Sequence, residues 1–223
     1  MEDDGVRQLL VLTLYPQYSA STNASTFDAL ARDFMQRRWL PDLRFISHYP
    51  DFAPYIQAMA EHISAYREAH GSADKLIFSY HGVPKRFLLK GYPYFCECHK
   101  TSRLLAEALG LADDQWMTTF QSRFGREEWL QPYTDATLKA LPGQGVKSVQ
   151  VFCPGFSADC LETVEEIDEE NRGYFEQAGG ESFAYISAIY SYLSLIHFSE
   201  PTRQSFFSFS FFFFSFYSFL FIF

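Results

Sequence analysis

KLIFSYHGVP, residues 75–84, is the stretch that decides the fold. Residues 75–80 form a short, mostly apolar run rich in Leu, Ile, Phe and Tyr, which is typical of a buried strand. His81 follows the run directly, and Gly82 and Pro84 end it. Because open α/β sheets bind ligands outside the carboxyl ends of their strands, we expect His81 to lie at a ligand-binding edge.

A histidine at such an edge suits proton transfer, since neutral imidazole accepts and releases a proton near pH 7. The strand pattern alone also fits a structural histidine that is satisfied by a hydrogen-bond partner. The choice between the two depends on a second group of polar side chains further along the chain.

The rest of the chain alternates between predicted strands and helices, which indicates an α/β fold with parallel sheets covered on both faces. Pro and Gly residues and possible capping boxes at Ser25/Asp28 and Asp159/Glu162 mark several boundaries. The predicted strands are 7–14, 44–49, 75–80, 116–121, 146–153 and 183–187, and the predicted helices are 26–38, 54–70, 99–109, 134–141 and 159–177.

Composition narrows the function. The 223 residues carry 18 Lys+Arg against 27 Asp+Glu, a net charge of −9, which argues against a nucleic-acid binder. Four Cys in a chain with no recognisable secretory leader favour reduced thiols and a cytosolic setting. We expect no transmembrane helix before residue 205.

The second group of polar side chains lies on the predicted acidic helix. Glu162, Glu166 and Glu170 are four residues apart, so each step turns the helix by only about 40° and the three carboxylates form a ladder. Like charges at this spacing repel, and hard oxygen ligands suit a divalent cation. Two other interpretations explain the same pattern. The helix dipole favours acidic residues in the first turn of a helix, and a solvated helix face also carries charged side chains.

The end of the chain differs from the rest. Residues 205–223, SFFSFSFFFFSFYSFLFIF, are low-complexity Phe and Ser. A membrane tail and an aggregation-prone extension are two interpretations. We favour a third, that SLIHFSEPTRQ and the residues after it come from translated adaptor DNA, and we exclude residues 189–223 from fold reasoning as an artefactual or disordered tail.

Four motifs identify a family. YPQYSAST, SYHGVPKR, TFQSRFGREEWLQPYTD and CPGFSADCLETVEEI resemble the bacterial ferrochelatases, and the resemblance runs from about residue 6 to residue 187. It implies two Rossmann-like parallel-sheet domains with the active cleft between them. Residues 1–71 would be the remaining part of an incomplete first domain, and residues 72–188 the second.

The resemblance also implies an activity and its residues. The family inserts ferrous iron into protoporphyrin IX to give protohaem, the last step of haem biosynthesis. Its site histidine falls on His81, its metal-site glutamate on Glu162, its acidic ladder on Glu166 and Glu170, and a porphyrin-contacting aromatic on Trp129. His81 would be proton acceptor or metal ligand and Glu162 metal ligand or proton relay, and the two either share a metal or divide these roles.

The chemistry of the substrates supports these residue types. A flat, apolar macrocycle needs aromatic walls, for which Tyr15 and Phe156 are further candidates beside Trp129. Ferrous iron is a substrate, and no cofactor is expected. Some relatives carry an iron–sulfur cluster, but Cys96 and Cys98 are one residue apart and do not make a four-ligand set.

The remaining expectations concern setting and alternatives. We expect a cytoplasmic protein with possible peripheral contact with the inner membrane. The alternatives are a non-catalytic tetrapyrrole or metal carrier on the same fold, a cobalt or nickel chelatase, and an inactive fragment. The fragment is an alternative because an early stretch of the family has no counterpart before Met1 and the tail replaces the family's last helix, so poor folding and weak activity are expected.

Overall fold

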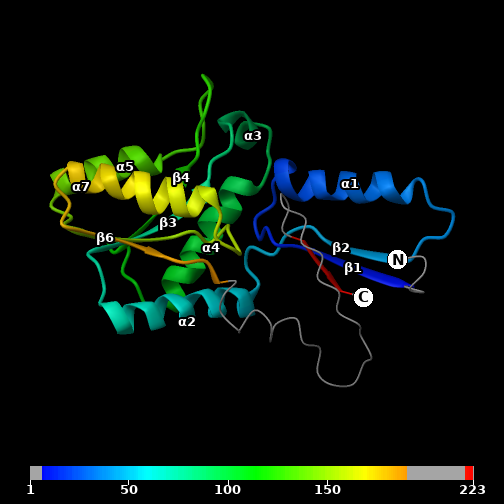
Figure 1. Ribbon diagram of the computed structural model, residues 1–223, viewed down its shortest axis with the longest axis horizontal. Coiled ribbons are helices and arrows are strands. Elements are labelled where there is room, and N and C mark those ends of the chain that lie inside the picture. Colours follow the sequence, from blue (N-terminus) through cyan, green and yellow to red (C-terminus); the bar gives the residue numbers. More distant parts are fainter. Residues whose placement is uncertain (1–6, 190–218, 223) are drawn as a thin grey trace. The chain divides into compact units, whose positions relative to one another are not determined.

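The computed structural model describes residues 7–189 and 219–222 (Figure 1). The chain divides into two compact units, residues 1–49 with 199–223, and residues 50–198. Each unit is built on its own sheet, and each is described here by itself.

The first unit has a three-stranded sheet in the order β2-β1-β7. β1 (Gln8–Thr13) pairs in parallel with β2 (Asp42–Ile46), and the π-helix η1 (Ala20–Ala24) and the helix α1 (Ser25–Phe34) connect them. β7 (Phe219–Ile222) pairs antiparallel with β1, so four residues of the tail that we excluded do form a strand. The other tail residues beyond 189 lie outside the described residues.

A buried asparagine fixes the turn after β1. The Asn23 amide nitrogen donates to the Thr13 hydroxyl at 2.9 Å and to the Tyr15 and Ser47 carbonyls at 3.0 and 2.7 Å. The Asn23 Oδ1 accepts from the Ser19 backbone N–H at 2.9 Å. Because this amide satisfies backbone groups after both strands, the chain enters a π-helical turn here, with Ser19 as its N-cap. The predicted cap at Ser25 is therefore wrong.

The second unit has a four-stranded sheet in the order β4-β3-β5-β6, and every pair is parallel. The predicted strands match it closely, since buried apolar runs are the strongest local signal for parallel strands. The strands are β3 (Lys75–His81), β4 (Trp116–Gln121), β5 (Ser148–Phe152) and β6 (Ser182–Ile186).

Helices cover both faces of this sheet, with α2 on one side and α5 and α7 on the other (Figure 1). Ile77, Val151 and Phe175 are fully buried members of a hydrophobic cluster between the sheet and the helices α5 and α7. The helices are α2 (Ala53–His70), α3 (Lys85–Leu89), α4 (Tyr94–Ala108), α5 (Thr134–Ala140), η2 (Pro142–Gln144), α6 (Leu161–Thr163), η3 (Val164–Asn171) and α7 (Arg172–Gln177).

The unit to which α2 belongs differs from the predicted domain ranges. The sequence grouped α2 with residues 1–71, whereas the helix packs in the second unit. The Arg67 guanidinium donates to the Gln150 side chain on β5 at 2.9 Å, and Gln150 donates to the Gly71 carbonyl at 2.9 Å. The division between the compact units accordingly falls between Tyr49 and Pro50.

The predicted acidic helix 159–177 is three segments, because η3 widens its middle into a π-helix. Cys160 and Thr163 form the capping box, so the predicted pair Asp159/Glu162 is wrong. The Asp159 carboxylate instead accepts hydrogen bonds from the Tyr185 hydroxyl at 2.6 Å and the Ala188 N–H at 3.1 Å, which ties this segment to the end of β6.

No helix that the described residues form is long and apolar enough to cross a membrane.

We predict that Gly82→Ala destabilises the protein by about 1–3 kcal/mol, because the new Cβ would lie 2.7 Å from the Gln121 carbonyl oxygen and 3.2 Å from the Trp129 ring. Gly143→Ala is the matched control, since a Cβ there meets nothing within 4 Å. Urea unfolding of both variants measures the difference. Equal free energies of unfolding for Gly82→Ala and Gly143→Ala would contradict the tight fit after His81.

Candidate functional site

His81 is the last residue of β3, at the carboxyl edge of the second sheet, as predicted. Its Nδ1 lies 2.7 Å from the Gly82 carbonyl oxygen. A carbonyl only accepts hydrogen bonds, so Nδ1 carries the hydrogen and the lone pair of the neutral ring is on Nε2. The Tyr94 hydroxyl donates to the His81 carbonyl at 2.9 Å and holds the backbone on the other side.

Gln121 connects His81 to the acidic segment. The two residues are register partners on adjacent strands, and the buried Gln121 amide donates from Nε2 to the Glu162 carbonyl at 2.6 Å. Its Oε1 accepts from the Ser79 hydroxyl at 2.7 Å, which fixes the orientation of the amide. The first turn of the acidic segment is therefore anchored one strand away from the imidazole.

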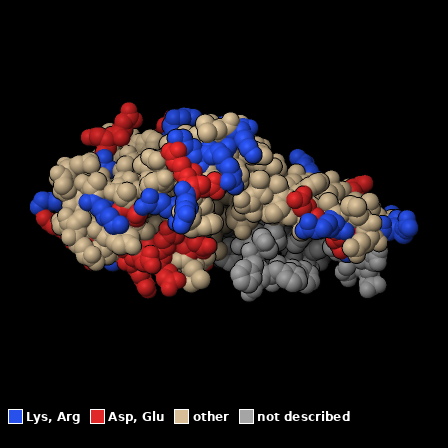
Figure 2. Space-filling view, turned by 90° about the horizontal axis from the view of Figure 1, so that it is seen from above, with Lys and Arg blue, Asp and Glu red and all other residues tan. Residues whose placement is uncertain are grey.

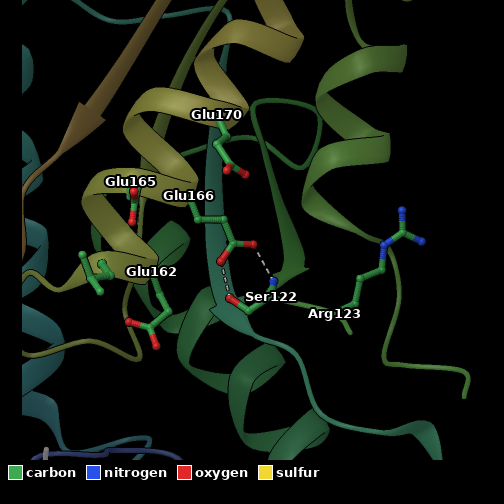
Figure 3. A pocket seen from close by; sticks show the side chains of 7 residues that line it. Ser122, Arg123, Glu162, Glu165, Glu166 and Glu170 are labelled. Carbon is green, nitrogen blue, oxygen red and sulfur yellow. Dashed lines mark hydrogen bonds between the residues drawn. The ribbon is translucent and has the colours of Figure 1, made fainter. Parts of the chain in front are cut away.

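The three predicted ladder carboxylates line one open pocket of about 440 Å³ in the second unit. Glu162, Glu166 and Glu170 follow one another along the same side of the segment (Figure 3). Their predicted common face is thus confirmed, whereas their binding of metal stays a prediction. The pocket is lined by Ser122, Arg123, Leu161, Glu162, Glu165, Glu166 and Glu170.

The surrounding surface is strongly acidic. Figure 2 shows Asp and Glu side chains gathered in one area on the side where η3 lies. Arg123, the cation among the lining residues, donates to the Asp135 carboxylate at 2.9 Å and stacks 4.1 Å from the centre of the Tyr133 ring. Its side chain is turned away from the glutamates, so it does not neutralise them (Figure 3).

The carboxyl group of Glu162 is biased toward its charged form. A hydrogen bond from the Cys160 thiol, together with the nearby His81, lowers the pKa of Glu162 against the opposing effect of burial. Burial raises the pKa of Cys160 to about 11, so this thiol is protonated at neutral pH and able to donate. Glu162 is therefore an ionised carboxylate within electrostatic reach of His81.

Glu166 is held more firmly than its neighbours. Its two carboxylate oxygens accept from the backbone N–H of Ser122, at 2.6 Å, and from the Ser122 hydroxyl. Ser122 has a φ of 62°, a left-handed conformation that costs a non-glycine residue on the order of 1 kcal/mol. The Asn171 amide also donates to the Glu166 carbonyl at 2.7 Å, so backbone and side chain are both fixed.

The three predicted aromatic walls lie in different surroundings. Trp129 is 5% exposed and packs against Gly82 and Phe124, directly beside the strand end that carries His81. Phe156 is partly buried against the core of the second unit. Tyr15 belongs to the first unit, where its carbonyl accepts from Asn23.

The cysteines are dispersed. Cys96 is exposed and Cys98 buried on α4, whereas Cys153 is buried and Cys160 half-buried near the acidic segment. Across residues 7–189 and 219–222, no three His, Cys, Asp or Glu side chains converge closely enough to form a ready-made metal site. The pocket carboxylates would therefore have to reorient before several of them could share one cation.

Reasoning from sequence missed four residues of this site: Gln121, Ser122, Phe124 and Glu165. Gln121 ends the predicted strand 116–121 and Ser122 follows it directly, so their position beside the strand of His81 is the signal that could have identified them. Phe124 is 73% exposed and its ring centre lies 4.7 Å from that of Trp129. Glu165 lines the pocket because the wider turn of the π-helix places its side chain at a different angle around the axis than an α-helix would.

The second unit is that of an α/β protein with an imidazole and a column of carboxylates at the carboxyl edge of a parallel sheet, the edge at which open α/β sheets bind their ligands. The chain belongs to the ferrochelatase family. The sequence model of that family, Ferrochelatase, matches residues 1–198.

Curated relatives agree with this assignment. The chain is 82% identical over 188 residues to a ferrochelatase of Alcanivorax borkumensis, covering 84% of this chain and 55% of the relative. It is 73% identical to that of Marinobacter nauticus, covering 85% and 51%, and 72% identical to that of Idiomarina loihiensis, covering 85% and 52%. The chain thus spans about half the length of these relatives.

We predict that Cys160→Ala raises the pKa of Glu162 toward its ordinary value, because the carboxylate loses the hydrogen bond that contributes most to lowering it. A carboxyl group whose pKa is lowered in the folded protein stabilises the folded state at pH values above its ordinary pKa. This stabilisation is lost as the pH falls through the lowered pKa. The variant should therefore lose it at a higher pH than the wild type. Carboxyl-carbon NMR titration measures the pKa, and an unchanged value in a folded variant would contradict the role of the thiol.

Proposed function

We propose that this protein is a ferrochelatase, which inserts ferrous iron into protoporphyrin IX to give protohaem. The observation that carries the proposal is that His81, with its lone pair on Nε2, lies within electrostatic reach of the ionised Glu162 in a chain of this family. The backbone of Glu162 is held by Gln121, the register partner of His81 on the adjacent strand. We assign the compact unit of residues 50–198 to the second chelatase domain.

His81 is the proton acceptor. Iron replaces two pyrrole hydrogens, which must leave as protons, and the bond from Nδ1 to the Gly82 carbonyl leaves Nε2 to take one of them. The Tyr94 bond to the His81 carbonyl keeps the residue in place during the transfer.

Glu162 and the pocket carboxylates handle the cation. The lowered pKa of Glu162 makes it a poor proton acceptor near neutral pH but a good ligand for a hard or borderline cation such as Fe²⁺. Glu170 and Glu165 are exposed along the same pocket, and Glu166 adds a fixed negative charge. This division of labour makes His81 the base and Glu162 the metal-binding residue.

Aromatic residues serve the macrocycle. Trp129 lies buried against the strand end that bears His81, and the exposed Phe124, whose ring packs on Trp129, presents an apolar surface there. Phe156 and Tyr15 are the further porphyrin contacts in this proposal. We place the reaction in the cytoplasm, at or near a membrane that supplies the apolar porphyrin, with no cofactor beyond the two substrates.

We predict that His81→Ala lowers the rate of iron insertion about 100-fold or more, because a positioned general base contributes that much to a proton transfer. The assay follows protohaem formation from protoporphyrin IX and Fe²⁺ under anaerobic conditions with the purified 223-residue chain. Porphyrin binding, measured by fluorescence, should persist in the variant. The control is His70→Ala, since His70 lies at the exposed end of α2.

Two outcomes would refute the proposal. One is a wild-type rate of iron insertion no greater than the uncatalysed rate. If porphyrin binding is intact, that result favours a non-catalytic carrier. If porphyrin binding is also absent, it favours an inactive fragment. The other is full insertion activity in His81→Ala.

A further inference from the structure

A side chain from α4 holds the turn that carries His81. The Tyr94 hydroxyl donates to the His81 carbonyl at 2.9 Å. The N–H of the same peptide group, which belongs to Gly82, donates to the Gln121 carbonyl on β4 at 2.7 Å. Both polar atoms of this peptide group are therefore bonded to neighbouring elements, and Tyr94 supplies the bond that comes from a side chain.

The orientation of the His81 ring depends on that peptide group. Its Nδ1 donates to the Gly82 carbonyl at 2.7 Å, and the direction of this carbonyl is set by the backbone torsions of a glycine. Glycine has the widest choice of backbone torsions of any residue, so the carbonyl would take several directions if the peptide group before it were free to turn. The two bonds on that peptide group therefore also fix the acceptor of Nδ1.

The Tyr94 hydroxyl is a permanent donor. Burial raises the pKa of Tyr94 well above its ordinary value, so the group keeps its hydrogen across the physiological range. A phenol has a single hydrogen, and a carbonyl can only accept one, so this hydrogen lies between Tyr94 and the His81 carbonyl.

Cys98 orders the phenol from the other side. It is fully buried, lies four residues after Tyr94 on the same side of α4, and is hydrogen-bonded to the Tyr94 hydroxyl. Burial raises the pKa of Cys98, so its thiol is protonated and donates to the phenol oxygen, whose own hydrogen is given to His81. Cys96 is exposed, so the two thiols of this motif lie in different surroundings.

We propose that Tyr94, ordered by Cys98, is a positioning residue for the imidazole of His81. Its hydroxyl holds the peptide group that follows His81, which keeps the Gly82 carbonyl within reach of Nδ1 and leaves the lone pair of the neutral ring on Nε2. The effect on the rate of proton transfer rests on the proposed iron insertion. The effect on the ring itself is a property of the folded chain and is measurable without any substrate.

The first test is nitrogen-15 NMR of the imidazole nitrogens in the full 223-residue chain, without metal or porphyrin, above the pH at which histidine titrates. The His81 signals are identified by their loss in His81→Ala. We expect the Nδ1–H form to dominate in the wild type. In Tyr94→Phe the ratio of the two neutral forms should shift about three- to tenfold toward Nε2–H, the size of effect that one buried hydrogen bond supports.

Tyr80→Phe is the matched control. The Tyr80 hydroxyl is buried and lies 3.0 Å from the Ser102 hydroxyl, so this variant also removes a buried hydrogen bond between β3 and α4. It should keep the wild-type ratio of the two ring forms, because it leaves the peptide group after His81 untouched. An unchanged ratio in a folded Tyr94→Phe, or an equal shift in Tyr80→Phe, would overturn the proposal.

Iron insertion supplies the catalytic readout. In Tyr94→Phe kcat should fall about three- to tenfold while the KM for the porphyrin stays within about twofold, because the base is turned away and the binding contacts remain. Tyr80→Phe should leave both constants at their wild-type values. A raised KM with unchanged kcat would make Tyr94 a binding residue, and two unchanged constants would mean that the ring orientation does not limit the transfer. Either result would overturn the proposal.

A second pair of variants decides the question if Tyr94→Phe does not reach the circular dichroism spectrum of the wild type. Cys98→Ser keeps a donor to the phenol and should keep the wild-type ratio of ring forms. Cys98→Ala removes the donor and should shift the ratio toward Nε2–H. The same ratio in both variants would overturn the proposal.

The failure of this inference and the failure of the proposed function are distinguishable. If the wild type does not insert iron, the proposed function fails, while the ratio of ring forms still tests whether Tyr94 positions His81. If the wild type inserts iron and Tyr94→Phe keeps the wild-type ratio, only the present inference fails.

Discussion

The amide of Gln121 is the contact on which the arrangement of the second unit's site depends. Gln121 is 3% exposed. Its amide accepts a hydrogen bond from the Ser79 hydroxyl on β3 and donates one to the Glu162 carbonyl of the acidic segment. A buried amide with both ends satisfied is costly to move, because any shift leaves a polar group unpaired away from water. The distance between the strand that ends in His81 and the turn that begins the carboxylate column is therefore set by one side chain.

The neighbouring Ser122 extends the same principle along the acidic segment. Gln121 holds the backbone of Glu162, and Ser122 holds the side chain of Glu166 one turn later. From Val164 to Asn171 the segment is a π-helix, a geometry that recurs at functional sites because its wide turn displaces side chains from α-helical positions. Here the displacement brings Glu165 to the pocket wall beside the three carboxylates at four-residue spacing.

The two units share one construction. In each, a π-helical segment lies beyond a strand's carboxyl end: η1 follows β1, and η3 follows β5. A buried polar side chain secures each turn, Asn23 in the first unit and Gln121 in the second. In both units a buried amide donates to a backbone carbonyl of the segment that follows a strand, which satisfies a polar group that lies away from water.

The amino-acid sequence alone determined the strands, the positions of His81 and Glu162 at a sheet edge, and the family, because buried apolar runs and long motifs are local signals. It also placed Glu162, Glu166 and Glu170 on one face. Only the tertiary structure decided the histidine tautomer, the restraint of Glu166, the membership of α2 in the second unit and the pairing of residues 219–222 with β1. These depend on hydrogen bonds between residues far apart in the chain, and local periodicity carries no record of such partners.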